Sequence, residues 1–508
     1  MGFAEKRGDY WRARYKLSSG KYGTVQDEDG ATVRFRTRRA AEQAADAEEV
    51  KVREGRRRPA VNASMLFIDY VNRWYAEQDL AASTMQTYRR HIEAHILPEF
   101  GHLTMAELER DGRAAIVEWE RAGRADYATL TVQGWRRVFH VILADAVREG
   151  LLPFNPASRP RGRGRVAGRS QARAPEKTIT NALGVVLIAE RMALLSGRDD
   201  EFVATVGMGF SGMRFGETVG LEAEFVRPGA IRVEWQLHEL DDGVLLRCPP
   251  KDDSYRTIAV PSWLTALLRE QIDRAGPKPC SCHGRTYVYR GHRPPRQGAR
   301  QVGPRLTDVG RRAGVSAGTV WNALHRRDQV ADATLQRVDA AVAELGYLVG
   351  SLPDGPTAPH WRRNGFATWL FGPAVSGWYP AKAPSPARPV PVLAEPWPGV
   401  PIRGRNAANR ADACWVPVAR DLTPHGLRHT YKTLMLGLDT PRPLMDLHMG
   451  HAKKTVSDAY DHVTADMVAR LLEGLTVLWQ NALAARRAMH PRSPVAVLDR
   501  LLGEESPA

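Results

Sequence analysis

The chain has 508 residues, with 72 Lys and Arg against 57 Asp and Glu, which gives a formal net charge of +15. Its length predicts about three or four domains, and its hydrophobic fraction of 43% excludes a wholly disordered chain. The positive charge suggests a polyanionic partner, with nucleic acid first and a membrane surface second. No apolar stretch is long enough for a membrane span, and four cysteines without a secretory signal favour a reducing cytoplasm.

The first 55 residues predict a small domain of three short strands, at residues 9–16, 22–26 and 32–37, followed by a helix over about 38–53. Basic and aromatic side chains alternate along these strands, as they do in a sheet that lies in a DNA groove. A solvated sheet whose aromatics form its core would show the same pattern. The residues expected to contact DNA are Arg12, Arg14, Lys16, Arg34 and Arg36.

Residues 62–157 show apolar side chains at the spacing of amphipathic helices and predict an all-helical domain. The four expected helices are 65–78, 83–97, 105–121 and 127–148. Four basic residues of this domain are candidates for phosphate contacts or for an ordinary solvated face: Arg89, Arg90, Arg136 and Arg137. Residues 158–174 carry six arginines among Gly, Pro and Ser, which predicts an extended basic linker.

The region from 175 to 484 mixes helical patterns with a β-rich stretch, with strands near 231–237, 243–248 and 257–260. Four short segments of this region hold reactive groups: a helix start, a predicted hairpin turn, a second helix start and a pair of residues near the end. In chain order these groups are Arg214 and Glu217, Lys251, His425 and Arg428, and finally His451 and Tyr460. His425 and Arg428 are three residues apart and so share a helix face.

Two Arg, a Lys, two His and a Tyr without a carboxylate cluster suit phosphoryl transfer without a bound metal. Guanidinium forks match the oxygens of a phosphate bidentately and neutralise the charge that a metal would otherwise carry. A tyrosine phenol becomes a nucleophile when cations stabilise its phenolate and a base accepts its proton. A Lys on a turn can protonate the leaving oxygen.

Five features of this region, taken in chain order, resemble the tyrosine recombinase (phage integrase) family of actinobacterial type. They are the Gly212–Glu217 segment, the turn lysine, the His-x-x-Arg box, Gly450-His451 and Tyr460. The resemblance implies a multidomain, mainly α fold with small β-sheets. It implies an arm-type DNA-binding domain of three strands and a helix at 1–55, a four-helix core-binding domain at 62–157 and an α+β catalytic domain at 175–484.

The resemblance also implies roles for the site residues. Tyr460 would attack the scissile phosphate and form a 3′-phosphotyrosyl link, releasing a 5′-hydroxyl. Arg214 and Arg428 would hold the phosphate oxygens, and His451 would donate a further hydrogen bond. Lys251 would protonate the leaving oxygen.

The other polar groups near these boxes have expected roles as well. His425 would be the general base, and Glu217 would orient the first arginine box unless it is an ordinary acid on a helix face. His429 is expected to be a hydrogen-bonding partner within its helix. Tyr431 is a rival nucleophile but is more typical of a core residue. No cofactor and no bound metal are expected, and the reaction is expected not to need ATP.

Within the catalytic region, residues 303–350 predict an insert, because 305–347 resembles the helix-turn-helix headpiece of lac-repressor-type regulators. The expected helices are 308–313, 316–325 and 334–345. Ser316 is expected to cap the second helix, Thr319 to meet a phosphate and Asn322 to contact a base. Ala317 and Gly318 are poor reading residues, so a vestigial insert or a protein–protein module is the alternative.

Four further segments remain. Residues 379–403 are rich in proline and predict an irregular loop. A helix over about 467–484 is expected to pack on a neighbouring copy or on its own domain, and 485–508 is expected to be a tail. Cys280-Ser281-Cys282-His283 suggests zinc, but with only the distant Cys414 as a further ligand, Cys280 and Cys282 are expected to be free thiols.

The sequence therefore predicts a cytoplasmic site-specific DNA recombinase that integrates or excises a phage or other mobile element. Its expected partners are duplex DNA at attachment sites, three further copies in a homotetramer at synapsis, and an excisionase or host DNA-bending protein, with no membrane. The alternative is a helix-turn-helix transcription regulator without catalysis.

Overall fold

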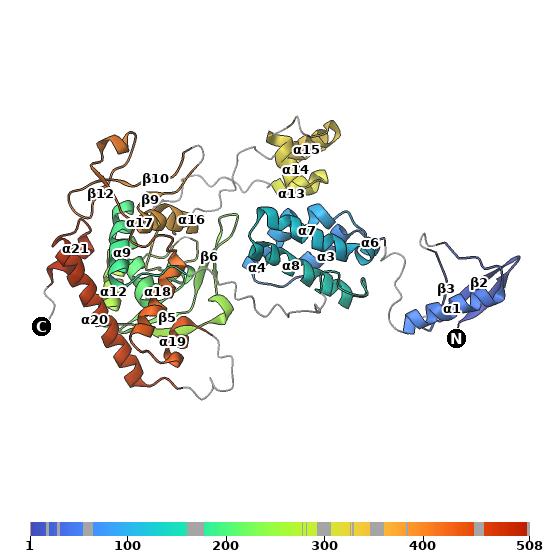
Figure 1. Ribbon diagram of the computed structural model, residues 1–508, viewed down its shortest axis with the longest axis horizontal. Helices are drawn as coiled ribbons and strands as arrows, with labels where there is room; N and C mark the ends of the chain where they lie inside the picture. Colours follow the sequence, from blue (N-terminus) through green and yellow to red (C-terminus); the bar gives the residue numbers. More distant parts are fainter. Residues whose placement is uncertain are drawn as a thin grey trace. The chain divides into compact units, whose positions relative to one another are not determined.

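The computed structural model describes residues 2–16, 20–27, 31–53, 64–159, 177–276, 278–280, 282–291, 306–325, 327, 330–345, 360–382, 385–451 and 462–504. The chain divides into two compact units, Met1–Arg169 and Ser170–Ala508. The described residues are mainly helical, with sheets of two or three strands, so the predicted fold class is confirmed (Figure 1). None of the helices in the described ranges is long and apolar enough to cross a membrane.

The N-terminal sheet has the antiparallel order β1–β2–β3 and packs on one helix. Its elements are β1 (Phe3–Arg7), β2 (Tyr10–Lys16), β3 (Tyr22–Thr24) and α1 (Arg38–Arg53). The predicted helix is confirmed, but the third predicted strand is wrong, because 32–37 forms only isolated bridges such as Trp11 to Phe35. The sheet instead uses β1, which a two-residue turn joins to β2, and Gly8 supplies the positive φ of +59° that this turn needs.

The helical part of the first unit packs around one core that includes Phe67, Trp74, Phe100 and Phe139. Its helices are α3 (Phe67–Ala76), α4 (Ala82–His91), α5 (Leu97–Phe100), α6 (Met105–Arg110), α7 (Gly112–Asp126) and α8 (Thr129–Arg148). A π-helical turn, Ile92–Ile96, carries α4 on into α5. The single helix predicted over 105–121 is divided at Asp111, and Thr104 and Glu107 cap α6 reciprocally.

The second unit surrounds two helices that are buried along most of their length, α9 and α10. Its main helices are α9 (Ala182–Ser196), α10 (Asp199–Ser211), α11 (Phe215–Val219), α12 (Ser262–Ala275), α18 (Pro424–Gly437), α19 (Arg442–Met449), α20 (Ala465–Met489) and α21 (Ala496–Gly503). Its strands β4 (Val226–Arg227), β5 (Ala230–Val233) and β8 (Arg256–Ala259) form one sheet, and β6 (Gln236–Glu239) and β7 (Leu245–Cys248) form another.

The turn that carries Lys251 does not close a hairpin, as the sequence predicted. Strand β7 pairs with β6, whereas β8 pairs with β5, so residues 249–255 connect two different sheets. A single 3₁₀ turn, Lys251–Asp253, lies in this connection. The sequence could not separate the two cases because strand partners are set by tertiary packing.

The proline-rich segment 379–403 is only partly irregular, because short strands order some of its residues. It follows α16 (Arg363–Phe366), a π-helical turn over Ala367–Phe371 and α17 (Gly372–Ser376). Short strands, β9 (Trp378–Tyr379), β10 (Arg388–Pro389), β11 (Pro391–Leu393), β12 (Val400–Pro401) and β13 (Ala413–Cys414), form two small antiparallel sheets. Val390 and Val392 enter the core, and this burial orders the segment in spite of its prolines.

The three helices predicted for the insert are confirmed as α13 (Leu306–Ala313), α14 (Ala317–His325) and α15 (Asp332–Leu345). They enclose a small core of their own that contains Val309, Val320 and Val338. Gly314 has a φ of +67°, which the turn between α13 and α14 requires.

The C-terminal region packs on its own unit, which is one of the two arrangements expected for the helix and corrects the expected tail, whereas contact with a neighbouring copy stays a prediction. Helix α20 buries Leu471, Leu475 and Trp479 in the same core as α9, and α21 adds Leu498 to that core. The Arg486 guanidinium of α20 is wholly buried and donates to both carboxylate oxygens of Glu190 in α9, at 2.7 and 2.6 Å. Trp397 stacks on this guanidinium at 4.3 Å.

Arg486→Met should destabilise the second unit by about 3–5 kcal/mol, because it leaves the Glu190 carboxylate buried without its counter-charge. Urea unfolding of the full chain measures this change in free energy. The double variant Glu190→Leu/Arg486→Met should recover most of the loss, since both charges are then removed. A loss below about 1 kcal/mol in the single variant would contradict this account.

Candidate active site

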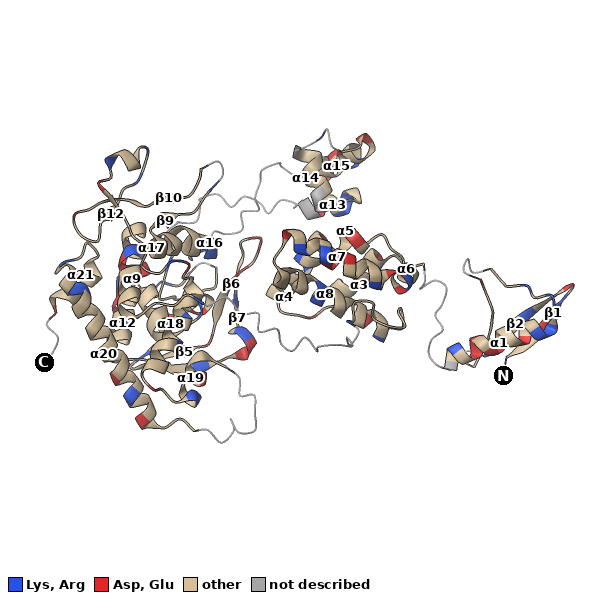
Figure 2. Cartoon of the chain, viewed as in Figure 1, with Lys and Arg blue, Asp and Glu red and all other residues tan. Residues whose placement is uncertain are grey.

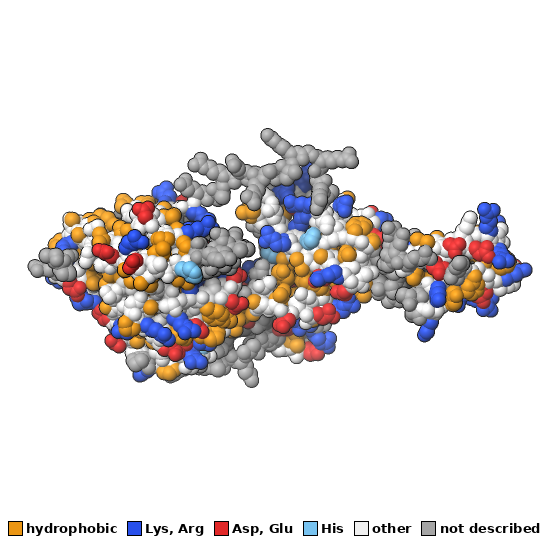
Figure 3. Space-filling view, turned by 90° about the horizontal axis from the view of Figure 1, so that it is seen from below, with side chains coloured by type: hydrophobic (Ala, Val, Ile, Leu, Met, Phe, Trp, Pro, Cys, Tyr) orange, Lys and Arg blue, Asp and Glu red, His pale blue; other side chains and the backbone are white. Residues whose placement is uncertain are grey.

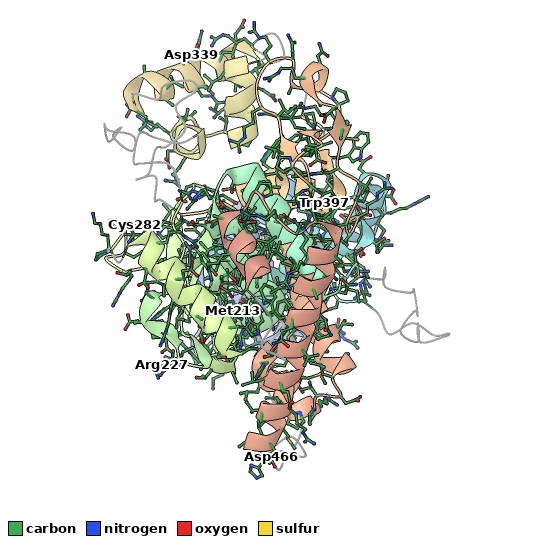
Figure 4. All side chains as sticks on the ribbon, turned by 90° about the vertical axis from the view of Figure 1, so that its left-hand side faces the viewer. Met213, Arg227, Cys282, Asp339, Trp397 and Asp466 are labelled. Atoms are coloured by element: carbon green, nitrogen blue, oxygen red, sulfur yellow. The ribbon has the colours of Figure 1, made fainter. Side chains whose placement is uncertain are left out.

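Arg214 is positioned by a sharp change of direction between α10 and α11. Gly212 ends α10 in the left-handed region, with a φ of +66°, and a Cβ there would lie only 2.5 Å from the Tyr431 ring. Arg214 then precedes α11 and donates its backbone N–H to Glu217 Oε2 at 2.8 Å. Met213, labelled in Figure 4, marks this turn within the second unit.

Glu217 is the buried anion at the centre of the site. It is 1% exposed and accepts from Arg214 Nη1 at 2.7 Å and from Arg256 at 2.7 and 3.1 Å. Burial alone would raise the pKa of Glu217, but the hydrogen bonds and charges of Arg256 and Arg214 hold it below its usual range. Glu217 therefore has the orienting role expected from the sequence and is not an ordinary surface acid.

Arg256, at the start of β8, was not expected to belong to the site. Besides Glu217, it contacts the carbonyl of His448 through Nε at 2.9 Å, so it joins the strand to α19. Gly450 follows α19 with a φ of +58°, and a Cβ there would approach Arg256 and Ser254 to 3.0 Å. A basic residue at a buried position of a strand is the sequence signal that could have revealed Arg256.

Arg428, in the first turns of α18, is 3% exposed. Its guanidinium donates to the carbonyl of Gly212 at 2.6 Å and to that of Met449. Within the described ranges no carboxylate forms an ion pair with it. Burial, together with the positive charges of Arg214 and Arg256, lowers the pKa of Arg428 to about 9. The site therefore holds three guanidinium groups around one carboxylate and is suited to an anion.

His425 lies one turn before Arg428 and is accessible at the surface. Its ring centroid is 4.9 Å from that of His429, and His429 Nε2 is 3.4 Å from Lys177 Nζ. Partial shielding from water, followed by the charges of His429 and Arg428, lowers the pKa of His425, so its ring is neutral at neutral pH and can accept a proton. Within α18, the ring of His429 lies against that of His425 and its carbonyl accepts from Thr433 Oγ1 at 3.1 Å, which agrees with the expected role as a hydrogen-bonding partner in its helix.

The structure places His451 and Lys251 at the surface of the same unit. His451 follows Gly450, and its Nδ1 contacts Asp446 Oδ1 at 3.2 Å, which leaves Nε2 for a further partner. Lys251 is exposed on its 3₁₀ turn, two residues before the Asp253–Ser254 step that leads to Arg256. Ser254 Oγ accepts from Arg214 Nη1 at 3.1 Å, so the segment 249–255 that carries Lys251 contacts Arg214 directly.

The structure describes only one of the two tyrosines that were considered as nucleophiles. Tyr431 is fully buried and its hydroxyl contacts His448 Nδ1 at 2.8 Å, which confirms the expectation that it is a core residue. Tyr460 lies outside the described residues.

Of the residues in the N-terminal sheet that were expected to contact DNA, only some have exposed side chains. Arg12 pairs with Glu5 at 2.9 Å and Arg14 donates to Thr24, whereas the side chains of Lys16, Arg34 and Arg36 are exposed. Figure 2 shows basic residues on β1 and β2.

In the helical part, Arg137 and Arg90 are exposed, and Arg89 is paired with Glu93 at 2.8 Å. The structure corrects the expectation that Arg136 could contact a phosphate. Its side chain is buried against Glu120 and the carbonyl of Ala157 and is not available to a phosphate.

In the insert, Ser316 caps α14 by accepting from the backbone N–H of Thr319 at 3.0 Å, which confirms its capping role. The Ser316 hydroxyl also contacts the Thr319 hydroxyl at 2.8 Å. Asn322 is half-buried on the same helix. Contact of these three residues with DNA stays a prediction.

Among the residues that the structure describes, one group of side chains could hold a metal: Cys280, Cys282, His283 and His360. Cys414, which the sequence suggested as a distant ligand, is exposed on β13 and does not belong to this group.

Residues 66–111 match the family model described as phage integrase, N-terminal SAM-like domain, and residues 305–349 match that of bacterial regulatory proteins, lacI family. The chain is 24% identical over 223 residues to an integrase of Mycobacterium phage D29, a match that covers 43% of this chain and 54% of that protein. An integrase of Mycobacterium phage FRAT1 is 23% identical over 223 residues, covering 43% of this chain and 61% of that protein. The chain thus spans little more than half the length of these relatives.

Among solved structures, the Tn1549 transposon integrase in complex with a circular intermediate DNA matches with a TM-score of 0.46 and 13% identity, over 81% of this chain and 100% of that one. The resemblance of this chain to phage integrases, and that of its inserted segment to lac-repressor-type regulators, are both confirmed by the family models and the phage relatives.

Proposed function

We propose that the protein is a site-specific tyrosine recombinase that cuts and rejoins duplex DNA, independently of ATP and of a catalytic metal, to integrate or excise a phage or other mobile element. Residues 1–55 would bind arm-type DNA, 62–157 would bind the core site, and the second unit would carry out the reaction. The proposed catalytic region extends beyond residue 484, because α21 belongs to its core.

The observation that carries the proposal is the buried cation at Arg428, which forms no ion pair with a carboxylate among the described residues. The guanidinium of Arg428 is buried and donates hydrogen bonds to two carbonyls. It lies near Arg214 and Arg256, and the single carboxylate of Glu217 is the counter-charge for both of these arginines. Such a cluster costs free energy in the absence of an anion. A phosphodiester held by Arg214 and Arg428 would relieve this cost and would bind in the bidentate geometry that guanidinium groups favour.

The steps of the proposed reaction use the roles that the resemblance implies for these residues. The neutral ring of His425 would accept the phenolic proton of Tyr460 as its oxygen attacks phosphorus. The bond from phosphorus to the 5′-oxygen breaks, and Lys251 would supply the proton to that oxygen. Arg214 and Arg428 would stabilise the charge that develops on the non-bridging oxygens, and His451 would donate a further hydrogen bond.

The proposed partner is duplex DNA, as the net charge of +15 also suggests. Figure 3 shows Lys and Arg interspersed with Asp and Glu over the face in view, so this charge is not gathered in one patch there. A homotetramer at synapsis and an excisionase or host DNA-bending protein as accessory partners complete the proposal, which places the protein in the cytoplasm. A transcription regulator is disfavoured because it would leave the arginine site without a use.

With nicked attachment-site DNA and EDTA, the wild-type chain should form a covalent protein–DNA complex that resists denaturant, and Tyr460→Phe should form none. Denaturing gel electrophoresis measures the complex. Tyr255→Phe is the matched control, because Tyr255 is an exposed tyrosine beside the Lys251 turn. Complex formation by Tyr460→Phe would overturn the proposed nucleophile.

Arg428→Lys should slow covalent complex formation by about 10²-fold or more, because a lysine keeps the charge but cannot hold two oxygens as a fork. Single-turnover rates at saturating protein measure this change, and gel shift should find DNA affinity within a few-fold of wild type. Arg442→Lys, at an exposed position of α19, should react at the wild-type rate. Equal rates for both variants would contradict the proposed contact.

Glu217→Gln should lower the free energy of unfolding at neutral pH, because it removes the counter-charge of Arg214 and Arg256. The folded-state pKa of Glu217 lies below its unfolded value of about 4.3. The stability that the Glu217 ion pairs contribute is therefore complete above that pH and is lost as pH falls through the folded-state pKa. Urea unfolding from pH 7 down to pH 3 should show the two proteins converging in acid. A difference that does not depend on pH would count against the ion pairs.

A further inference from the structure

Four potential metal ligands converge in the second unit, at a distance from the arginine site. The ligand atoms of Cys280, Cys282, His283 and His360 all lie within 4.8 Å of one another. Figure 4 labels both Cys282 and Met213, and the two are well separated in it. The first three residues follow α12, and the fourth lies beyond the helix-turn-helix insert.

Four of the six separations between these atoms lie close to the edges of a metal-centred tetrahedron. Cys282 Sγ is 3.4 Å from Cys280 Sγ, 3.2 Å from His283 Nδ1 and 3.5 Å from His360 Nε2, and Cys280 Sγ is 3.8 Å from His283 Nδ1. With metal–sulfur bonds of about 2.3 Å and metal–nitrogen bonds of about 2.0–2.1 Å, the sulfur–sulfur edge is about 3.8 Å and the sulfur–nitrogen edge about 3.6 Å. The two sulfurs are too far apart for a disulfide bond, which is about 2.05 Å long.

The surrounding hydrogen bonds orient the ligand atoms toward a common centre. His283 Nε2 contacts the carbonyl of Leu245 at 2.8 Å, so Nε2 carries the proton and Nδ1 presents its lone pair to the two sulfurs. The backbone N–H of His283 donates to Cys280 Sγ at 3.3 Å. A tight turn, in which Gly284 has a φ of +64° and donates to the carbonyl of Cys280, brings the sulfurs and His283 to one side.

His360 completes the set from a distant part of the chain. It is 6% exposed, and its ring lies edge-on to Tyr287 at 4.7 Å. The next residue, Trp361, stacks on Tyr289 at 5.1 Å and donates from Nε1 to Glu201 at 3.0 Å. The segments before and after the insert are thus fixed side by side, and the four ligands bridge them.

We propose that Cys280, Cys282, His283 and His360 bind a structural Zn²⁺ ion that joins the two ends of the inserted segment. Two thiolates and two imidazoles in a tetrahedron favour zinc over hard cations such as Mg²⁺ and Ca²⁺. Four protein ligands leave no open position for substrate, so the ion stabilises the fold and does not take part in strand cleavage. Fixing His360 to the Cys280 turn closes a loop that contains all three helices of the insert.

Metal analysis of the full chain, purified without a metal-binding tag, tests the proposal. Inductively coupled plasma mass spectrometry should find about one zinc per chain, and Cys280→Ser/Cys282→Ser should reduce it to near zero. Cys414→Ser, which changes an exposed cysteine outside the cluster, should keep the zinc. A wild-type chain that binds no zinc when refolded with it, or zinc that persists in the double variant, would overturn the proposal.

Cobalt substitution keeps the proposal testable if the double variant fails to fold. Co²⁺ added to the metal-free full chain should give the intense visible bands of a tetrahedral site with sulfur-to-metal charge transfer. His360→Cys keeps four ligands and should strengthen the charge-transfer band by adding a third thiolate, whereas His360→Ala should weaken zinc affinity. A weak, octahedral-type spectrum, or one that His360→Cys leaves unchanged, would contradict the assignment. None of these readouts depends on DNA cleavage, so they stand or fall separately from the recombinase proposal.

Discussion

The buried carboxylate of Glu217 is the constraint on which the site depends. It accepts from Arg214 across the α10–α11 turn and from Arg256 on β8, and Arg256 in turn holds the carbonyl of His448 at the end of α19. Three parts of the chain, the α10–α11 turn, β8 and the end of α19, are thereby fixed around one negative charge. Because Arg428 brings a further buried cation without a carboxylate partner in the described ranges, the assembly has a deficit of negative charge that a phosphate would fill.

The sequence predicted those parts of the site that local signals define. Arg214 with Glu217 and His425 with Arg428 each lie within one helical turn, and the insert was readable from Gly314 and the Ser316 cap. Arg256 was missed because its burial depends on β8 pairing with β5, a contact between distant segments. The same reason explains the wrong hairpin at Lys251, the strands of the proline-rich segment and the burial of Arg136 against Glu120.

The cysteine cluster illustrates the same limit more sharply. In the sequence, Cys280, Cys282 and His283 lack a fourth ligand nearby, and free thiols were the reasonable expectation. His360 reaches them only because the Tyr287–Tyr289 segment packs against His360 and Trp361 after the chain has passed through the insert. The segments that flank the insert therefore meet at a point where two kinds of zinc ligand, thiolate and imidazole, come together.

The central claim, that the arginine cluster serves attack by Tyr460 on DNA, is tested most directly by identifying the residue that becomes linked to DNA. The covalent complex formed by the wild-type chain on nicked attachment-site DNA is digested with nuclease and protease and analysed by mass spectrometry. The account predicts a nucleotide attached through a 3′-phosphate to the peptide that contains Tyr460. A nucleotide attached to any other residue, or DNA cleaved without an attached protein, would contradict it.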